Sequence, residues 1–530
     1  MPPFLLHRAS LGALISGLII HHTIFIKGEW HLHGPLILRL YVALSLISSV
    51  TYCYIAKQNF VSCVLSTAFL LSFHVIGLFG SIFLYRAWFH PLKHFHGPFL
   101  AKTSKIWHVW KIRHTQNHLF LEALRKEYGD FIRTGPNELT IFHPGGLNVM
   151  SRTENATRSS WYDLFYPYLS IATVRDQFSH DKRRRIWESA FTTNGMGYET
   201  QIREHARRMR NTVKRPTGKE VNMNLEIYHF TYNVMRDIEF GQLSKASDRD
   251  WKTSVNTLHT GASSFTILPL VRDWDKLMSS CKDKITERLA IPTPERRDLS
   301  AWLIEDAKKR EVIDSPDEQR WLAGDAFAAI LAGFDSTAST LIFAFLYLGE
   351  YPEYQTRIFK EIQTAGGDIS ELSFQDLQKL RFLNAFIDEV LRLHPALLSS
   401  GSKIICDNGR IIGNTFIPGG TEVYAPRWSF GRHEAHYERP QEFLPDRWLE
   451  DSSLVKDLRA FTPWSIGKWS CVGRQVALFI LRYVITLLVR NYSFCLPAED
   501  NGSQVEAQCQ DQVTAHPGQL TLIFHPRDAV

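Results

Sequence analysis

Near its C-terminal end the chain reads Phe461-Thr-Pro-Trp464-Ser-Ile-Gly467-Lys-Trp469-Ser-Cys471-Val-Gly473-Arg-Gln-Val-Ala. A single cysteine stands between two glycines and directly before an apolar run with helical spacing. Gly467 and Gly473 predict unusual dihedral angles and a close approach of the backbone to a flat group. The field at the start of the next helix favours the thiolate of Cys471, the form that binds metals. A lone cysteine is also often a small buried apolar residue, so this segment alone leaves two interpretations.

A second segment places an acid and a base three positions apart on a predicted helix, Leu380-Arg-Phe-Leu383-Asn-Ala-Phe-Ile387-Asp-Glu389-Val-Leu391-Arg392. On a solvent-facing helix such a pair contributes only about 0.2–0.5 kcal/mol. Further along, Pro440-Gln-Glu-Phe443-Leu-Pro445-Asp-Arg447-Trp448 supplies another arginine. Two guanidiniums bound to the carboxylate of Glu389 can pin the loop that carries the cysteine.

The longest apolar segment, Trp321–Glu350, has no proline and only three charged residues, which predicts a helix buried in a large domain. Within it lies Leu331-Ala-Gly333-Phe-Asp335-Ser336-Thr337-Ala, where a hydroxyl can bond the carbonyl four residues earlier. Strand-like runs are short. They cover Leu139–Phe142, Lys403–Cys406, Thr421–Ala425 and Leu520–Phe524. We therefore expect one large, mainly α domain with small β-sheets (α+β).

These segments, in this order, resemble the cytochrome P-450 superfamily. The loop around Cys471 resembles the haem-ligand loop F-x-x-G-x-R-x-C-x-G, with Trp464 at the Phe position and Trp469 at the Arg position. Glu389, Arg392 and Arg447 resemble the family's buried Glu/Arg cluster. Residues 332–337 resemble A/G-G-x-D/E-T-T. The resemblance extends from the Phe89-His-Pro segment to Pro526-Arg527 and implies the P-450 fold, with haem b on the thiolate of Cys471.

The resemblance also implies roles for further side chains. Asp335, Ser336 and Thr337 would relay protons to dioxygen, with Ser336 at the usual Thr position. Trp464, Gly467 and Gly473 would shape the cofactor loop.

His180 and Arg184, in a helix that read alone is a solvated basic face or a nucleic-acid patch, would approach the haem propionates together with Lys403. Because Trp469 cannot pair with a propionate, these three side chains would carry more of that pairing than usual.

The first 85 residues contain three apolar runs, Leu11–Ile26, Leu36–Ile55 and Phe60–Tyr85. A membrane span needs ~20 apolar residues, so residues 1–88 are predicted to form an anchor of two or three transmembrane helices. Lysines and arginines after the third run predict a cytosolic flank. We expect a proline-containing hinge over 89–110 and a catalytic domain over 111–530, facing the cytosol from the endoplasmic reticulum. The alternative is a buried apolar helical subdomain.

Composition limits the remaining functions. The chain has 530 residues, a net charge of +6 and seven cysteines without a CxxC pair, which excludes a disulfide framework and a zinc ribbon. No glycine-rich nucleotide-binding fingerprint appears, so NADPH would act only through a partner. The resemblance implies an NADPH–cytochrome reductase, possibly with cytochrome b5, and no nucleic acid. A basic surface for that acidic partner is predicted from Lys182, Arg183, Lys468 and Arg474.

The implied function is a monooxygenase that oxidises a lipophilic small molecule, by analogy a terpenoid or alkaloid of fungal secondary metabolism. Substrate contact is one interpretation of an aromatic-rich segment, and core packing is the other; its residues are Trp161, Tyr162, Phe165, Tyr166 and Tyr168. Two alternatives remain: the same fold catalysing desaturation or rearrangement, and a non-catalytic membrane-tethered haem- or ligand-binding protein.

Overall fold

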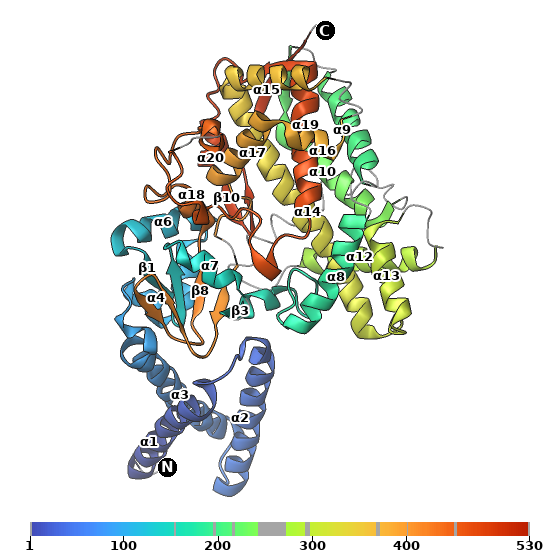
Figure 1. The fold of residues 1–530 in the computed structure, drawn as a ribbon. Helices are drawn as coiled ribbons and strands as arrows, with labels where there is room; N and C mark the ends of the chain where they lie inside the picture. Colours follow the sequence, from blue (N-terminus) through green and yellow to red (C-terminus); the bar gives the residue numbers. More distant parts are fainter. Residues whose placement is uncertain are drawn as a thin grey trace. The chain divides into compact units, whose positions relative to one another are not determined.

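The computed structural model describes residues 3–152, 155–193, 198–214, 218–241, 272–291, 297–366, 372–399, 401–449 and 453–527 (Figure 1). The chain forms two compact units, residues 1–105 with 133–137, and residues 106–132 with 138–530.

The α-helices are α1 Pro3–Ile20, α2 Gly34–Ala56, α3 Phe60–Leu84, α4 Phe99–Thr103, α5 Lys105–Lys111, α6 Asn117–Tyr128, α7 Gly145–Ser151, α8 Gln177–Thr193, α9 Glu199–Lys214, α10 Met223–Phe240, α12 Arg272–Leu289, α13 Leu299–Lys309, α14 Pro316–Glu350, α15 Pro352–Ala365, α16 Phe374–Lys379, α17 Arg381–Leu393, α18 Arg427–Gly431, α19 Arg474–Asn491 and α20 Ser503–Ala507. The strands are β1 Phe131–Gly135, β2 Glu138–Ile141, β3 Ala156–Arg158, β4 Glu220–Asn222, β5 Lys403–Ile405, β6 Arg410–Ile412, β7 Thr415–Ile417, β8 Glu422–Tyr424, β9 Tyr492–Cys495, β10 Gln510–Gln512, β11 Thr514–His516 and β12 Thr521–Pro526.

Small residues let two N-terminal helices meet backbone to backbone. A Cβ atom on Gly17 of α1 would lie 2.2 Å from the His74 carbonyl oxygen, and one on Gly77 of α3 would lie 2.1 Å from that of Leu14. Such close approach is typical of helix packing in lipid, where van der Waals contact replaces the hydrophobic effect.

One polar chain links all three N-terminal helices. The His74 ring of α3 is hydrogen-bonded to the Ser16 hydroxyl of α1 at 2.8 Å and to the Tyr41 hydroxyl of α2 at 3.0 Å. Such polar links help helices to associate in an apolar medium. The link shows that α1, α2 and α3 form one packed bundle.

The three N-terminal helical segments, His7–Phe25, His31–Ala56 and Phe60–Phe89, are each long and apolar enough to cross a membrane. Few of their residues are buried by the protein itself, 17%, 6% and 17% of the most apolar window, against 72% for α14. The three segments are therefore compatible with membrane anchoring, whereas α14 is a core helix.

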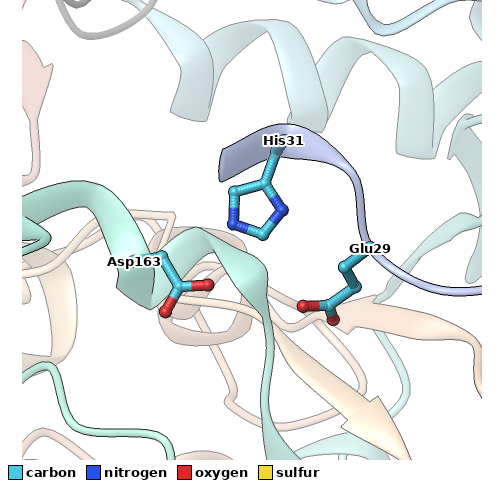
Figure 2. Close-up of side chains that lie close together, drawn as sticks. All are labelled: Glu29, His31 and Asp163. Carbon is cyan, nitrogen blue, oxygen red and sulfur yellow. The ribbon is translucent and has the colours of Figure 1, made fainter. Parts of the chain in front are cut away.

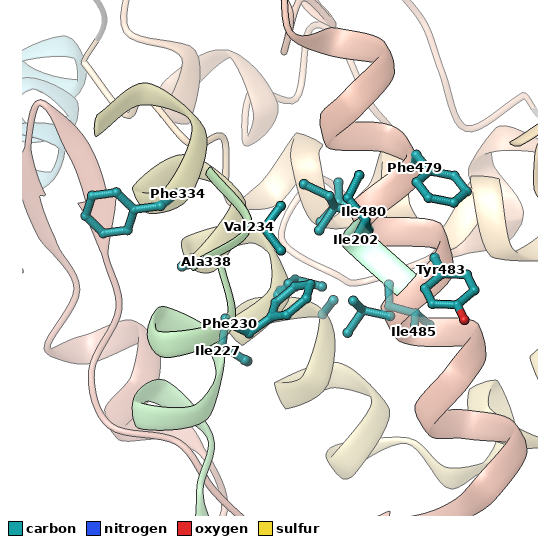
Figure 3. Packing of buried hydrophobic residues seen from close by; sticks show 14 of the residues in the cluster. Ile202, Ile227, Phe230, Val234, Phe334, Ala338, Phe479, Ile480, Tyr483 and Ile485 are labelled. Carbon is teal, nitrogen blue, oxygen red and sulfur yellow. The ribbon is translucent and has the colours of Figure 1, made fainter. Parts of the chain in front are cut away.

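Helix α14 forms the centre of the larger unit. It begins five residues before the predicted Trp321, because Ser315 caps it by accepting a hydrogen bond from the Glu318 amide at 3.1 Å and Pro316 occupies its first turn. Its neighbours are α10, α12, α17 and α19. Figure 3 shows part of this core, with Phe230 and Val234 from α10, Phe334 and Ala338 from α14, and Phe479, Ile480 and Tyr483 from α19.

The sheets are small, as predicted. Strand β2 pairs in parallel with β8, β8 pairs antiparallel with β5, and β5 pairs antiparallel with β3. The last pairing sets Arg158 opposite Lys403. Strand β12 lies between β4 and β9, while β6 with β7 and β10 with β11 form two-stranded sheets. The four strand-like runs read from the sequence correspond to β2, β5, β8 and β12.

Candidate active site

The cysteine loop runs from a short 3₁₀ turn, η9 Gly467–Trp469, to the start of α19. The Cys471 amide donates to the Trp464 carbonyl at 2.8 Å, and the Ser470 amide donates to the Gly467 carbonyl at 3.0 Å. Gly467 has φ of +70°, and a Cβ there would lie 2.8 Å from the Ser151 carbonyl oxygen. Both facts favour glycine at this position.

Gly473 differs from the expectation. Its φ is −83°, so the predicted unusual dihedral angle is wrong for this glycine. Gly473 is the N-cap residue of α19, and a Cβ there would lie 3.9 Å from Cys471 Sγ, an ordinary contact. Among the described residues, neither the backbone angles nor a close contact requires glycine at this position.

The Cys471 side chain is accessible, yet it lies among enough protein atoms that desolvation matters. Burial raises the pKa of the thiol, while the Gly473 amide and the Arg184 and Arg474 guanidiniums act in the opposite direction. The helix start acts in the predicted direction, but desolvation outweighs it, so the pKa of Cys471 is raised and the thiol is favoured in the protein alone. A coordinated metal cation would supply the missing positive charge, because a coordinating thiol is deprotonated outright.

The structure brings Glu389, Arg392 and Arg447 together with fully buried side chains. Arg392 donates to both carboxylate oxygens of Glu389 at 2.8 Å. Arg447 Nε donates to the same carboxylate at 3.3 Å, and the Trp448 indole donates at 2.9 Å. The interpretation of a solvent-facing ion pair is therefore excluded.

The outer nitrogens of both arginines bond the chain around them. Arg392 donates to the carbonyls of Pro440 at 2.7 Å and Glu442 at 2.9 Å. Arg447 donates to the carbonyls of Glu438 at 2.7 Å and Leu454 at 2.8 Å. These bonds satisfy two positive charges that share one negative charge, and they fix the segment that precedes the cysteine loop.

The acid and hydroxyl groups of α14 have different surroundings. Asp335 is buried and accepts a hydrogen bond from the Thr514 hydroxyl of β11. Ser336 donates to the Ala332 carbonyl, the i−4 bond expected from the sequence. Thr337 is buried. Ala332 is exposed in the middle of α14, beside the half-buried Leu331 and Gly333, which indicates that the helix passes an open space there. Thr514 was not predicted.

Three basic side chains gather on the indole of Trp469. The His180 ring lies 4.1 Å from it between centroids, Lys403 Nζ lies 4.2 Å from its centroid, and Arg158 Cζ lies 4.1 Å from it. All three bases are buried. His180 and Lys403 were predicted site residues, whereas Arg158 was missed.

Arg184 does not join this group. Its Nε donates to Glu188 at 2.7 Å, and one terminal nitrogen donates to the carbonyls of Lys468 and Ser470 at 2.8 and 2.7 Å. It therefore braces the backbone of the cysteine loop.

The predicted basic surface needs one correction. Lys182, Lys468 and Arg474 are exposed, but Arg183 is buried and pairs with Glu318 at 2.7 Å and with Asp325. Successive residues of a helix point about 100° apart, so Arg183 faces α14 while Lys182 faces outward.

The aromatic-rich segment around η5, Ser160–Phe165, forms no single wall. Trp161 and Tyr162 contact each other edge-to-face at 5.0 Å. Tyr166 is exposed, and Tyr168 packs on the core. The Phe165 side chain lies outside the described residues. Tyr162 faces the bases instead, 4.8 Å from Arg158 Cζ and 5.4 Å from Lys403 Nζ.

Three side chains with metal-binding chemistry are drawn in Figure 2. Glu29 and His31 belong to the smaller unit and Asp163 to the larger one. The Asp163 carboxylate is paired with Arg175 at 2.7 Å. We assign no metal to these residues.

A family profile for cytochrome P-450 matches residues 102–524. The chain belongs to the cytochrome P-450 family. It is 30% identical to a tryprostatin B 6-hydroxylase of Neosartorya fischeri, over 92% of this chain and 93% of that protein. It is also 30% identical to the cytochrome P-450 monooxygenase FCK2 of Fusarium pseudograminearum, over 97% of both chains. The predicted family and monooxygenase class are confirmed.

The fold is confirmed by a solved structure. The crystal structure of the cytochrome P-450DA haem domain has a TM-score of 0.66 at 17% identity, covering 78% of this chain and 94% of that one. The match shows that this P-450 has the mainly helical haem-domain fold predicted from its sequence.

Family membership implies a haem held by cysteine thiolate, and the residues present fit that group. Cys471 is accessible at the start of α19. Lys403 Nζ and Arg158 Nε are buried and make no hydrogen bond within the described residues. A buried guanidinium, and a buried lysine when it is protonated, call for an anion, and the haem carboxylates would provide one.

Proposed function

We propose that the protein hydroxylates, or oxidises in a related way, a lipophilic small molecule of fungal secondary metabolism such as a terpenoid or alkaloid. It would use dioxygen and electrons from NADPH. The observation that carries the proposal is the accessible Cys471 at the start of α19. Full-length similarity to a hydroxylase and to monooxygenases of fungi supports it.

Several residues would hold the haem, which when bound supplies the activation of dioxygen. Cys471 would be the axial thiolate ligand. Gly467, Gly473 and Trp464 would give its loop the required shape. Lys403 and His180 would face the haem carboxylates.

Arg184 would act on the same site mainly by holding the loop backbone through the carbonyls of Lys468 and Ser470. Glu389, Arg392 and Arg447 would fix the preceding segment as a structural clamp.

Protons would reach the active site past α14. The Ser336 hydroxyl is half-buried, so it can contact solvent while bonded to the Ala332 carbonyl. Asp335, the preceding residue, would serve as the proton source behind it. Thr337 is buried and would assist by packing and orientation.

Electrons would come from an acidic NADPH–cytochrome reductase, with cytochrome b5 as a possible second donor. Lys182, Lys468 and Arg474 are exposed. Lys468 and Arg474 flank Cys471 in the sequence, and Lys182 belongs to α8, which contacts the cysteine loop through the ion pair of Asp181 with Lys468. Lys468 pairs with Asp181 at 2.9 Å. Lys182 and Arg474 then leave this surface with a net positive charge. Such complementarity speeds association with an acidic partner.

The domain division proposed is a membrane anchor over residues 1–88, a hinge over 89–110 and a catalytic domain over 111–530. The catalytic domain would face the cytosol from the endoplasmic reticulum. Alkaline carbonate extraction of membranes tests the anchor. The full chain should remain in the membrane pellet and a chain beginning at residue 89 should be released.

The activity itself is tested with reductase, NADPH and ¹⁸O₂ on extracts of the host's secondary metabolites. Incorporation of one labelled oxygen atom into a product supports hydroxylation. Oxidised product without label would instead indicate desaturation or rearrangement. Haem binding with no NADPH consumption by any extract would favour the non-catalytic binding protein.

A further inference from the structure

A cavity lies between the three N-terminal helices, wholly within the smaller unit. Its volume of about 650 Å³ falls within the range of about 300–1,000 Å³ that is usual for ligand pockets. All three helices line it, with Ala13 and Ile20 from α1, Leu44 from α2, and Leu70 and Leu71 from α3. The cavity is therefore a mainly apolar space between helices that are compatible with membrane anchoring.

The cavity is elongated and has two distinct ends. Its lining on α2 extends from Ile37 to Tyr52, which is about 22 Å along the helix axis. Helices α2 and α3 are antiparallel neighbours, joined by the short turn of residues 57–59. Tyr52 of α2 and Ser66 of α3 therefore line the end near this turn, whereas Tyr41 and His74 lie further from it.

Unpaired hydroxyl groups gather at the end near the turn. Ser45 and Thr67 also line the cavity, but each hydroxyl bonds the carbonyl four residues earlier in its own helix, at 2.7 and 3.0 Å. The hydroxyls of Ser48, Tyr52 and Ser66 make no hydrogen bond within the described residues. An unpaired hydroxyl in an apolar medium costs free energy, so these three groups call for a polar partner inside the cavity.

The depth of Ser48 makes this requirement stronger. It lies eight residues, or about 12 Å, before the end of α2. That position is inside the apolar layer if α2 crosses a membrane, because a span needs ~20 residues to cross the hydrocarbon core. Water is scarce at that depth. A bound molecule is therefore the partner that fits.

The lining also defines the polarity of the occupant. It contains no lysine, arginine, aspartate or glutamate, and all of its residues belong to the described part of the chain. Nothing in it would pair with the phosphate of a phospholipid headgroup. Hydroxyls at one end and apolar side chains along the rest fit a neutral, elongated molecule with one hydroxyl. A rigid molecule loses little conformational freedom on binding, and membrane sterols have this chemistry.

We propose that the cavity between α1, α2 and α3 binds a membrane sterol. Its hydroxyl bonds with Ser48, Tyr52 and Ser66, and its ring system extends toward Tyr41 and His74. The inference goes beyond the proposed oxidation and rests only on the proposed membrane anchor, which carbonate extraction tests separately. The bound sterol contacts all three helices and stabilises their association.

Photolabelling tests the site in the full-length holoprotein, reconstituted into phosphatidylcholine vesicles. The probe is a sterol that carries a diazirine in its ring system and keeps its free hydroxyl. We expect saturable labelling of peptides from α1, α2 and α3 that excess unlabelled sterol displaces. Labelling that unlabelled sterol does not displace would overturn the proposal.

Filling the cavity separates it from the outer surface of the helices. Leu71→Trp enlarges a half-buried side chain of the lining, and Leu65→Trp, at an exposed position of the same helix outside the lining, is the matched control. The displaceable labelling should fall about tenfold in Leu71→Trp. It should remain at the parent level in Leu65→Trp. Equal labelling of the two variants would contradict a site inside the cavity.

Removing hydroxyls tests the assigned orientation. Ser48→Ala combined with Ser66→Ala should weaken the competition by unlabelled sterol about fivefold, the effect of a lost hydrogen bond. Ser72→Ala is the control, because its hydroxyl bonds the Phe69 carbonyl outside the lining. The methyl ether of the sterol should compete more weakly than the sterol itself with the parent protein. Equal competition by the two molecules would overturn the hydroxyl contact.

Carbonate extraction shows which variants still insert into the membrane. If the variants do not insert, the parent protein alone decides. A photoreactive phosphatidylcholine that labels the same peptides, and that sterol does not displace, would assign the cavity to an acyl chain and overturn the proposal. Release of the parent by carbonate would instead overturn the membrane anchor.

Discussion

The Thr514 hydroxyl donates a hydrogen bond to the Asp335 carboxylate, which ties strand β11 to the middle of α14. The two residues lie far apart in sequence and both are buried. A carboxylate that accepts such a bond has a fixed orientation. The C-terminal hairpin β10–β11 therefore helps to fix the orientation of the Asp335 carboxylate, which precedes Ser336.

Replacing Thr514 by valine tests this relationship. Thr514→Val keeps the side-chain shape and removes the donor, so the free energy of unfolding should fall by about 1 kcal/mol. We expect more hydrogen peroxide released per NADPH consumed, because Asp335, the acid proposed to deliver protons, loses its orientation. Thr514→Ser should restore coupling. Unchanged peroxide release in Thr514→Val would show that Asp335 is held by other contacts.

The Glu389 cluster predicts a large loss of stability. Glu389→Gln leaves Arg392 and Arg447 buried with too little negative charge, which typically costs about 3–5 kcal/mol. Glu442→Gln is the matched control, because its carboxylate pairs with Arg439 at the surface, where such pairs contribute about 0–1 kcal/mol. Chemical denaturation of the two variants gives both values. Equal losses of unfolding free energy in the two variants would mean that burial of the Glu389 cluster does not increase the cost of removing its negative charge.

Lys403 predicts a pH-dependent stability of the protein without haem. Burial, with Arg158 and Arg427 nearby, lowers the pKa of Lys403 from 10.5 to about 6. The unfolded chain then binds more protons between pH 6 and 10.5, so stability increases with pH across that window. Lys403→Met should stabilise the apoprotein at pH 7 by about 1–4 kcal/mol.

The gain in stability from Lys403→Met should become smaller as the pH approaches 10.5. Thermal unfolding of the apoprotein at several pH values measures this gain. Lys379→Met, at an exposed lysine, is the control and should change stability by less than about 0.5 kcal/mol. A gain in stability that does not change with pH would contradict the lowered pKa of Lys403.

Packing of the N-terminal helices gives a further prediction. Gly77→Leu places a side chain where the Leu14 carbonyl already lies, whereas Gly80→Leu meets open space. In membranes, cysteines at positions 16 and 74, whose side chains are hydrogen-bonded in the parent, should form a disulfide on oxidation. Gly77→Leu should reduce this cross-link and Gly80→Leu should not. Equal cross-linking in both would show that α1 and α3 do not pack closely.

Hydrophobic patterning predicted much of the fold. The long apolar segment Trp321–Glu350, with only three charged residues, was sufficient to identify the central helix, and the short apolar runs identified four strands. Charged segments were less informative, because the sequence of α8 does not show which of its arginines face α14. Arg183 was therefore assigned to the surface, although it is buried and pairs with Asp325 and Glu318.

Residues of the candidate site could be predicted where they belong to a recognisable sequence motif. Glu389 and Arg447 could be connected only through the family resemblance, since no periodicity links them. Arg158 escaped detection because its relation to Lys403 depends on the pairing of β3 with β5. The signal in the sequence was Trp469, which carries no charge where the resemblance implies an arginine, and it does not show which residues lie beside it.

The central claim is that Cys471 binds the haem iron as a thiolate. The carbon monoxide difference spectrum of the reduced holoprotein tests it most directly. The parent and a Cys406→Ala control should show the red-shifted band of thiolate ligation, and Cys471→Ala should lose it. A histidine-type band in the parent, or the same thiolate band in Cys471→Ala, would contradict the account.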